Sequence, residues 1–132
     1  PEIEQTLGGL AGDSIRLVFT PHLLPITRGI LSTMYCQAEQ GVDQAAIDLA
    51  YREQYQHESF VRVRQEPPSV QAVRGSNFCD LFARFDPRTG RIVIVSVIDN
   101  LVKGAAGQAV QNMNLMLGLE ETAGLHAIPL AP

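Results

Sequence analysis

Hydrophobic and polar residues alternate along several stretches of the chain with the two-residue period that is typical of a β-strand. This alternation, or enrichment in β-branched and aromatic residues, predicts strands over residues 15–20, 29–36, 60–64, 70–74, 76–85 and 91–97. The last segment is nearly all β-branched and apolar, which predicts a central strand buried on both faces. A DPRTG turn sequence at residues 86–90 separates the last two segments, so we expect them to form a hairpin.

Three segments carry the signals of α-helices. The first helix is predicted over residues 2–10, because proline and acids favour the first turn and glycines follow. The second begins after Asp43, whose side chain is suited to cap a helix N-terminus. The third is capped by Asp99 or Asn100 and continues to about residue 118.

The order of these elements predicts an α+β fold. It is one helix, two strands, a helix, four strands and a last helix, which indicates a mixed, largely antiparallel sheet with the helices on one face. The other face must meet solvent or a partner. We therefore expect a homodimer, or a higher oligomer, that forms through the sheet.

Composition and charge exclude several classes of protein. The 132 residues are 45% apolar and 18% charged, which is typical of one globular domain. A net charge of −4 without a run of basic residues argues against nucleic acid as a partner. No apolar stretch has the length of a membrane span, so no membrane partner is expected. Cys36 and Cys79 lack metal-ligand spacing, which indicates reduced thiols, a cytoplasmic protein and no metal site.

The chain begins without an initiator methionine, at Pro1 in what resembles the first turn of a helix. We interpret it as a single domain, residues 1–132, of a longer protein.

The start of the last helix carries two glycines, Gly104 and Gly107. Each costs about 1 kcal/mol relative to alanine in a helix, and their spacing of three predicts that they share one helical face. One interpretation is that bared backbone amides bind a phosphate, carboxylate or carboxamide. The other is close packing against a neighbouring element, which the spacing alone favours.

The sequence of this helix resembles a known signature. Residues 99–114, DNLVKGAAGQAVQNMN, are similar to the C-terminal signature of N-acetyl-γ-glutamyl-phosphate reductases. Weaker blocks of the same family follow in the family's order, and together they extend the resemblance over nearly the whole chain. These blocks are PEI at residues 1–3, FTPHL at 19–23 with Pro25 and Arg28-Gly29, and GSNFCD at 75–80.

The resemblance implies an activity for the whole protein. Members use NADPH to reduce N-acetyl-γ-glutamyl phosphate to the semialdehyde with release of phosphate, a step of arginine biosynthesis. A cysteine thiolate attacks the acyl phosphate, hydride transfer to the thioester follows, and a histidine acts as acid and base. The resemblance also implies the mixed-sheet fold of the C-terminal domain of glyceraldehyde-phosphate and aspartate-semialdehyde dehydrogenases.

The chain departs from the family in what it contains. It has no Gly-rich dinucleotide fingerprint, and the family's nucleophilic cysteine and catalytic histidine match positions before Pro1. We therefore expect the isolated chain to be inactive, and we expect a helix over about residues 100–117 to pack against a missing nucleotide-binding domain. Cys36 and Cys79 do not match the nucleophile and are predicted to be buried packing groups.

The resemblance also suggests site residues, each with a structural alternative. Glu2 would support the missing histidine, or would only favour a helix N-terminus. Arg28 would bind the anionic substrate through its guanidinium, or would be a solvated arginine. Ser76 and Asn77 would donate hydrogen bonds to the substrate, or would only form a turn.

The cofactor NADP(H) would lie beside the last helix. The residues expected to contact its nicotinamide are Asn100, Lys103, Gly104 and Gly107, although Lys103 could instead meet solvent. We expect His22 to be a structural histidine bonded to the backbone.

Two other functional classes remain open on the residues alone. The first is a non-catalytic dimerisation or regulatory module, and the second is a small-molecule-binding domain with an anion near Asn100. An open glycine face on the last helix would favour the reductase, whereas a buried one would favour the module.

Overall fold

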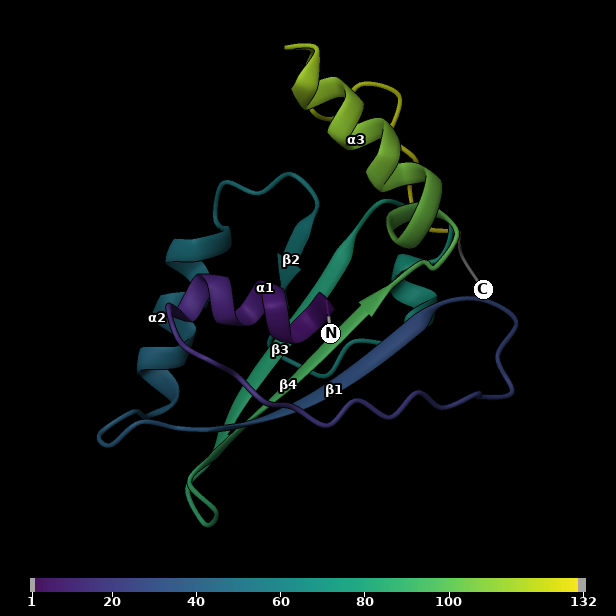
Figure 1. Ribbon diagram of the computed structural model, residues 1–132. Helices are drawn as coiled ribbons and strands as arrows, with labels where there is room; N and C mark the ends of the chain where they lie inside the picture. The colour runs from purple at the N-terminus through teal and green to yellow at the C-terminus, as the bar shows by residue number, and fades with distance from the viewer. Residues whose placement is uncertain (1, 131–132) are drawn as a thin grey trace.

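Residues 2–130, which this computed structural model describes, fold around one four-stranded sheet (Figure 1). The sheet has the order β1-β4-β3-β2, in which β4 pairs antiparallel with both β1 and β3, and β2 pairs parallel with β3. The predicted α+β class with a mixed, mostly antiparallel sheet is confirmed. The strands are β1 (Ile30–Gln37), β2 (Val61–Val63), β3 (Cys79–Asp86) and β4 (Arg91–Ile98). The helices are α1 (Glu2–Ala11), α2 (Gln44–Tyr55), the 3₁₀ helix η1 (Val70–Val73), the π-helix η2 (Val102–Ala106) and α3 (Gly107–Met116).

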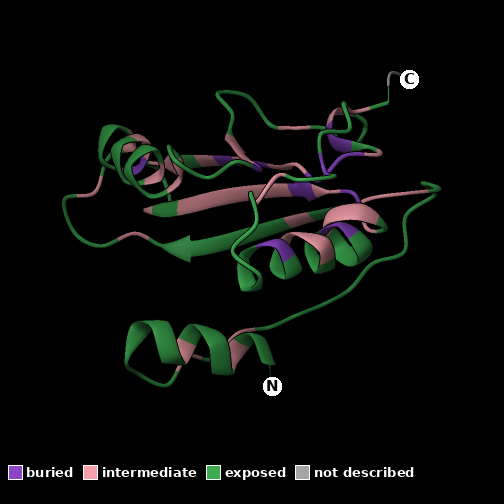
Figure 2. Cartoon of the chain, turned by 90° about the horizontal axis from the view of Figure 1, so that it is seen from above, coloured by how far each residue is buried: buried purple, intermediate pink, exposed green. Residues whose placement is uncertain are grey.

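The three predicted α-helices are present. The side chain of Asp43 accepts a hydrogen bond from the Ala46 amide, at 2.9 Å, so it caps α2 as expected. Pro1, which the sequence places in the first turn of α1, lies outside the described residues. In Figure 2, α1 lies apart from the sheet, and none of its residues is buried.

The predicted hairpin joins β3 to β4. The amides of Thr89 and Gly90 donate to the carbonyl of Asp86, at 3.2 and 2.9 Å, and Gly90 has the positive φ of 65° that a tight turn requires. Strand β4 is central, as expected from its composition. It is only partly buried, however: Val97 is fully enclosed, while most of its other residues are half-buried.

Two predicted strands are wrong. Residues 15–20 form irregular extended chain, because alternation alone does not supply a neighbouring strand with which to pair. Residues 70–73 form η1, in which the amides of Ala72 and Arg74 donate to carbonyls three residues earlier. The local turn therefore replaces the extended form that was expected after the two prolines at 67 and 68.

Much apolar surface is exposed around a small core. The buried apolar residues of the described chain are Ile47, Phe60, Val73, Phe82, Val97 and Leu125. Large exposed apolar side chains lie on the segment before β1, on β1 itself and around the end of α3, including Phe19, Leu23, Leu31, Tyr35, Met116 and Leu117. Exposed apolar surface of this kind is typical of sites that contact protein, membrane or ligand.

The cysteines differ from their predicted burial. Cys36 is exposed, because it lies on β1, an edge strand of the sheet. Cys79 is half-buried, and its Sγ lies 3.5 Å from Ser96 Oγ. Across residues 2–130, every helix is too short or too polar to cross a membrane.

Candidate functional site

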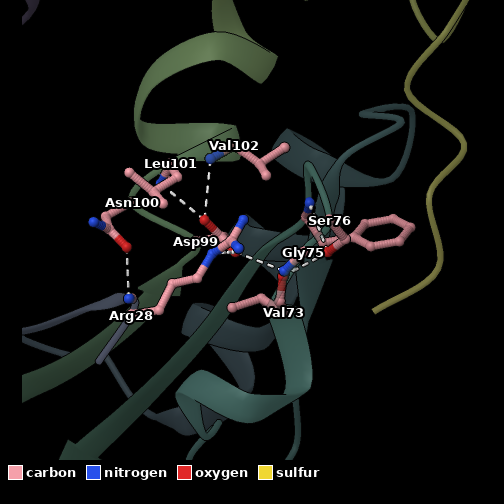
Figure 3. A network of polar contacts seen from close by, with 10 residues as sticks. Arg28, Val73, Gly75, Ser76, Asp99, Asn100, Leu101 and Val102 are labelled. Atoms are coloured by element: carbon pink, nitrogen blue, oxygen red, sulfur yellow. Dashed lines mark hydrogen bonds and ion pairs between the residues drawn. The ribbon is translucent and has the colours of Figure 1, made fainter. Parts of the chain in front are cut away.

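The carboxylate of Asp99 joins three segments of the chain at the end of β4 (Figure 3). Its Oδ1 accepts hydrogen bonds from the amides of Leu101 and Val102, at 2.8 and 3.0 Å. Its Oδ2 accepts from the Gly75 amide at 2.6 Å and lies 2.7 Å from Nε of Arg28. Asp99, rather than Asn100, therefore caps the last helical segment.

Asp99 is fully buried and yet favours the charged form. Burial raises the pKa of its carboxyl group by desolvation. Hydrogen bonds from the amides of Gly75, Leu101 and Val102, together with Arg28, lower the pKa, and they outweigh the burial. The net result is a pKa below the ordinary value for aspartate, so Asp99 is a fixed negative charge at neutral pH.

Asn100 holds the start of β1. Its Oδ1 accepts a hydrogen bond from the Gly29 amide at 2.7 Å. Gly29 has a φ of 111°, and a β-carbon there would lie 1.9 Å from Cγ1 of Val70. Only glycine fits this position, because any side chain would overlap η1.

Ser76 and Asn77, predicted substrate donors, are buried and bonded inside the domain. The Ser76 hydroxyl donates to the Val73 carbonyl at 2.8 Å, and the Asn77 amide nitrogen donates to Oε1 of Gln111 at 2.9 Å. The Asn77 Oδ1 atom is buried, and no residue of the described chain donates a hydrogen bond to it. A β-carbon on Gly107 would lie 2.3 Å from this oxygen.

The prediction that Gly104 and Gly107 share one helical face is wrong. Gly104 is exposed, whereas Gly107 is buried against Asn77. The cause is η2, whose amides of Gly104 and Ala106 donate to carbonyls five residues earlier. The widened π turn changes the angular spacing of the two glycines. A β-carbon on Gly104 would meet Asp99 and Ile98 at the end of β4, at 3.4 and 3.5 Å, whereas one on Gly107 would overlap Asn77.

Lys103 belongs to a polar chain that the sequence analysis missed. Its ammonium donates to Oε1 of Gln111 at 2.6 Å and lies 5.6 Å from the ring centre of Phe60. Gln111 in turn donates to Oε1 of Glu121 at 2.5 Å. The position of Gln111 within the family-like sequence at residues 99–114 was the signal that could have identified it.

The structure brings most of the predicted site residues together and leaves one apart. Arg28, Ser76, Asn77, Asn100 and the glycine-bearing turn converge where β4 ends. Glu2 is exposed on α1, which lies apart from the sheet in Figure 2.

The Nδ1 atom of His22 is 3.0 Å from the Thr20 carbonyl, which agrees with a histidine bonded to the backbone. Among residues 2–130, no three His, Cys, Asp or Glu side chains group in a way that could hold a metal ion.

Comparison with known proteins gives consistent matches. Residues 1–100 match the family described as semialdehyde dehydrogenase, dimerisation domain. The whole chain aligns with proteins named N-acetyl-gamma-glutamyl-phosphate reductase: it is 57% identical to that of Symbiobacterium thermophilum, 56% to that of Citrifermentans bemidjiense and 53% to that of Desulfotalea psychrophila. The chain spans 39% of the length of each of these relatives. It therefore belongs to the family of semialdehyde dehydrogenase dimerisation domains.

Proposed function

We propose that the chain is the part of an NADPH-dependent N-acetyl-γ-glutamyl-phosphate reductase that forms the subunit contact and supplies part of the substrate and cofactor sites. The whole protein would reduce the acyl phosphate to the semialdehyde and release phosphate. The observation that carries this proposal is the 53–57% identity, over the whole chain, to relatives with that name. The convergence of separate segments at Asp99 supports it, because a binding site needs such a rigid junction.

Arg28 is the proposed anchor for the anionic substrate. Its Nε faces Asp99 at 2.7 Å, and its side chain is 28% exposed. Within residues 2–130, no hydrogen bond to another residue engages its terminal nitrogens. A carboxylate or a phosphoryl group could therefore accept two parallel hydrogen bonds from this end of the guanidinium.

The cofactor would approach the exposed turn of η2. When bound, NADPH would supply the hydride. Gly104, Ala105 and Ala106 are small and exposed, so a flat ring fits against them. Asn100 would orient the carboxamide through its amide nitrogen, since its oxygen is held by Gly29, and Lys103 would bring a positive charge. Gly107 would act only through packing, because it is covered by Asn77.

Two surfaces of the domain, the sheet at β1 and the last helical segment, would contact other protein. We expect two copies to associate through the sheet, where the exposed side chains of β1 offer an apolar surface. We also expect the helical segment from about residue 100 to 117 to pack against the nucleotide-binding domain. Its exposed Met113, Leu115, Met116 and Leu117 support this expectation.

A non-catalytic dimerisation or regulatory module is the second candidate. The burial of Gly107 inside the domain favours it, since one of the two glycines serves internal packing. The exposure of Gly104 favours the reductase instead. A measurement of catalytic activity is therefore needed to distinguish the reductase from the module.

The deciding experiment measures NADPH oxidation with N-acetyl-γ-glutamyl phosphate, for the 132-residue chain and for the full-length protein that contains it. We expect activity only in the full-length protein, and we expect Glu2→Gln and Arg28→Lys to lower it. A full-length protein that folds and binds NADPH but does not turn over this substrate would overturn the reductase proposal and favour the module.

A further inference from the structure

Two adjacent residues at the end of β4 hold two adjacent residues at the start of β1. Asp99 pairs with Arg28, and Asn100 accepts a hydrogen bond from the amide of the next residue, Gly29. The pairing of Ile30 with Ile98 continues this contact into the sheet. The residues that follow β4 therefore set the position of Arg28 and also begin the last helical segment (Figure 3).

The Asp99 carboxylate has more partners than helix capping requires. Two backbone amides on Oδ1 complete the cap, and Oδ2 is left for the Gly75 amide and Arg28 Nε. The three amides donate hydrogen bonds and Arg28 Nε forms an ion pair with Oδ2, so the buried charge is compensated. The arginine is only partly enclosed while the aspartate is fully enclosed, so the pair extends from the interior to the surface.

We infer that Asp99 is a positioning residue, which fixes the Arg28 guanidinium by its Nε edge so that its terminal nitrogens present a bidentate site for a carboxylate or phosphoryl group. This inference rests on the proposed function for the identity of the substrate. It assigns to Asp99 a role beyond the helix cap that its sequence position predicts. Asn at position 99 keeps one oxygen for the amides of Leu101 and Val102 at the start of η2, so Asp99→Asn should weaken binding of the anion far more than binding of NADPH.

The chain offers a matched control. Asp80 on β3 is also fully buried, and its Oδ1 lies 2.5 Å from Nε of Arg62 on β2. Asp80→Asn therefore removes a buried aspartate–arginine pair of the same kind outside the junction at Asp99. Comparison of this variant with Asp99→Asn separates a general loss of stability from a loss of Arg28 positioning.

The test measures kcat and KM of the full-length reductase for Asp99→Asn, Arg28→Lys, the double variant and Asp80→Asn. We expect Asp99→Asn to raise the KM for N-acetyl-γ-glutamyl phosphate by about tenfold or more, with a much smaller change in the KM for NADPH. The double variant should be no worse than Arg28→Lys alone, because both changes act on one guanidinium. Asp80→Asn should leave both KM values unchanged. A folded Asp99→Asn enzyme with an unchanged substrate KM, or additive effects in the double variant, would overturn the inference.

Two further measurements test the inference if Asp99→Asn does not fold or if the wild-type reductase is inactive. If Asp99→Asn does not fold, Asp99→Glu keeps the charge but displaces the carboxylate, and it should raise the same KM. If the wild-type reductase proves inactive, the proposed function fails separately. The 132-residue chain is then titrated with inorganic phosphate while the side-chain N–H NMR signal of Arg28 is followed. We expect phosphate to shift this signal in the wild type and in Asp80→Asn but not in Asp99→Asn. An equal shift in all three, or none in any, would refute the positioning role.

Discussion

The side-chain oxygen of Asn77 occupies the space that a β-carbon on Gly107 would need, since the two atoms would lie 2.3 Å apart. The same β-carbon would lie 2.8 Å from the Val102 carbonyl oxygen. Asn77 lies between η1 and β3, and Gly107 is the first residue of α3. This contact therefore packs the start of α3 against the segment that leads into the sheet. Gly107 is therefore required by packing, whatever ligand the helix meets.

Gly107→Ala should destabilise the domain, because the backbone and Asn77 must move apart. We expect a loss of about 1–3 kcal/mol in the free energy of unfolding, as for other overpacked positions. Gly104→Ala is the matched control, since its β-carbon would meet nothing closer than 3.4 Å. It should be neutral or stabilising by up to about 1 kcal/mol. Urea unfolding followed by circular dichroism measures both, and equal effects of the two substitutions would contradict the packing role.

Gly29→Ala should be more costly than Gly41→Ala. Both glycines have a positive φ, of 111° and 87°, but only at Gly29 would a β-carbon overlap another side chain, that of Val70. We expect Gly41→Ala to cost about 1–2 kcal/mol for its backbone alone. The overlap should add about 1–3 kcal/mol at Gly29. Thermal and urea unfolding of the two variants tests this order, and a Gly29→Ala variant as stable as Gly41→Ala would disprove the overlap.

The stability of the domain should depend on pH through Asp99. Its pKa is lower in the folded chain than the ordinary value of an unfolded aspartate, about 3.9. Its stabilisation is therefore complete above that ordinary value and is lost as pH falls through the lower, folded value.

Urea unfolding over a series of acidic pH values measures this dependence. We expect Asp99→Asn to reduce the loss of stability with falling pH. Asp86→Asn should also reduce this loss, because the Arg88 amide donates a hydrogen bond to the Asp86 carboxylate and so lowers the pKa of Asp86. An Asp99→Asn variant with the pH dependence of the wild type would show that Asp99 does not titrate in this way.

The oligomeric state should depend on the exposed side chains of β1. Tyr35 is 66% exposed on that strand, so Tyr35→Asp should place a charge in the proposed sheet contact and yield monomers. Leu49→Asp is the control, since Leu49 is an exposed apolar residue on α2. Analytical ultracentrifugation of the wild type and both variants distinguishes the outcomes. A monomeric wild type, or dissociation by Leu49→Asp alone, would exclude the β1 contact.

Local patterns in the sequence determined most of the elements. The β-branched residues of β4, the turn after Asp86 and the cap at Asp43 each act within a few residues, so their effects are readable without the fold. The family-like sequence at residues 99–114 likewise located the helix that leads into the candidate site. Local patterns were also enough for the α+β class, because the order and period of elements restrict how layers can pack.

Only the tertiary structure decided which patterns became strands and which polar groups meet. Residues 15–20 alternate as a strand does but have no neighbouring strand, and pairing is a property of two segments rather than one. The spacing of Gly104 and Gly107 predicts one face only for an α-helix, and the π turn at η2 separates them. The pairing of Arg28 with Asp99 spans 71 residues of sequence separation, and only the pairing of β1 with β4 brings these residues together. Such contacts depend on the register between segments distant in the chain, which no local pattern encodes.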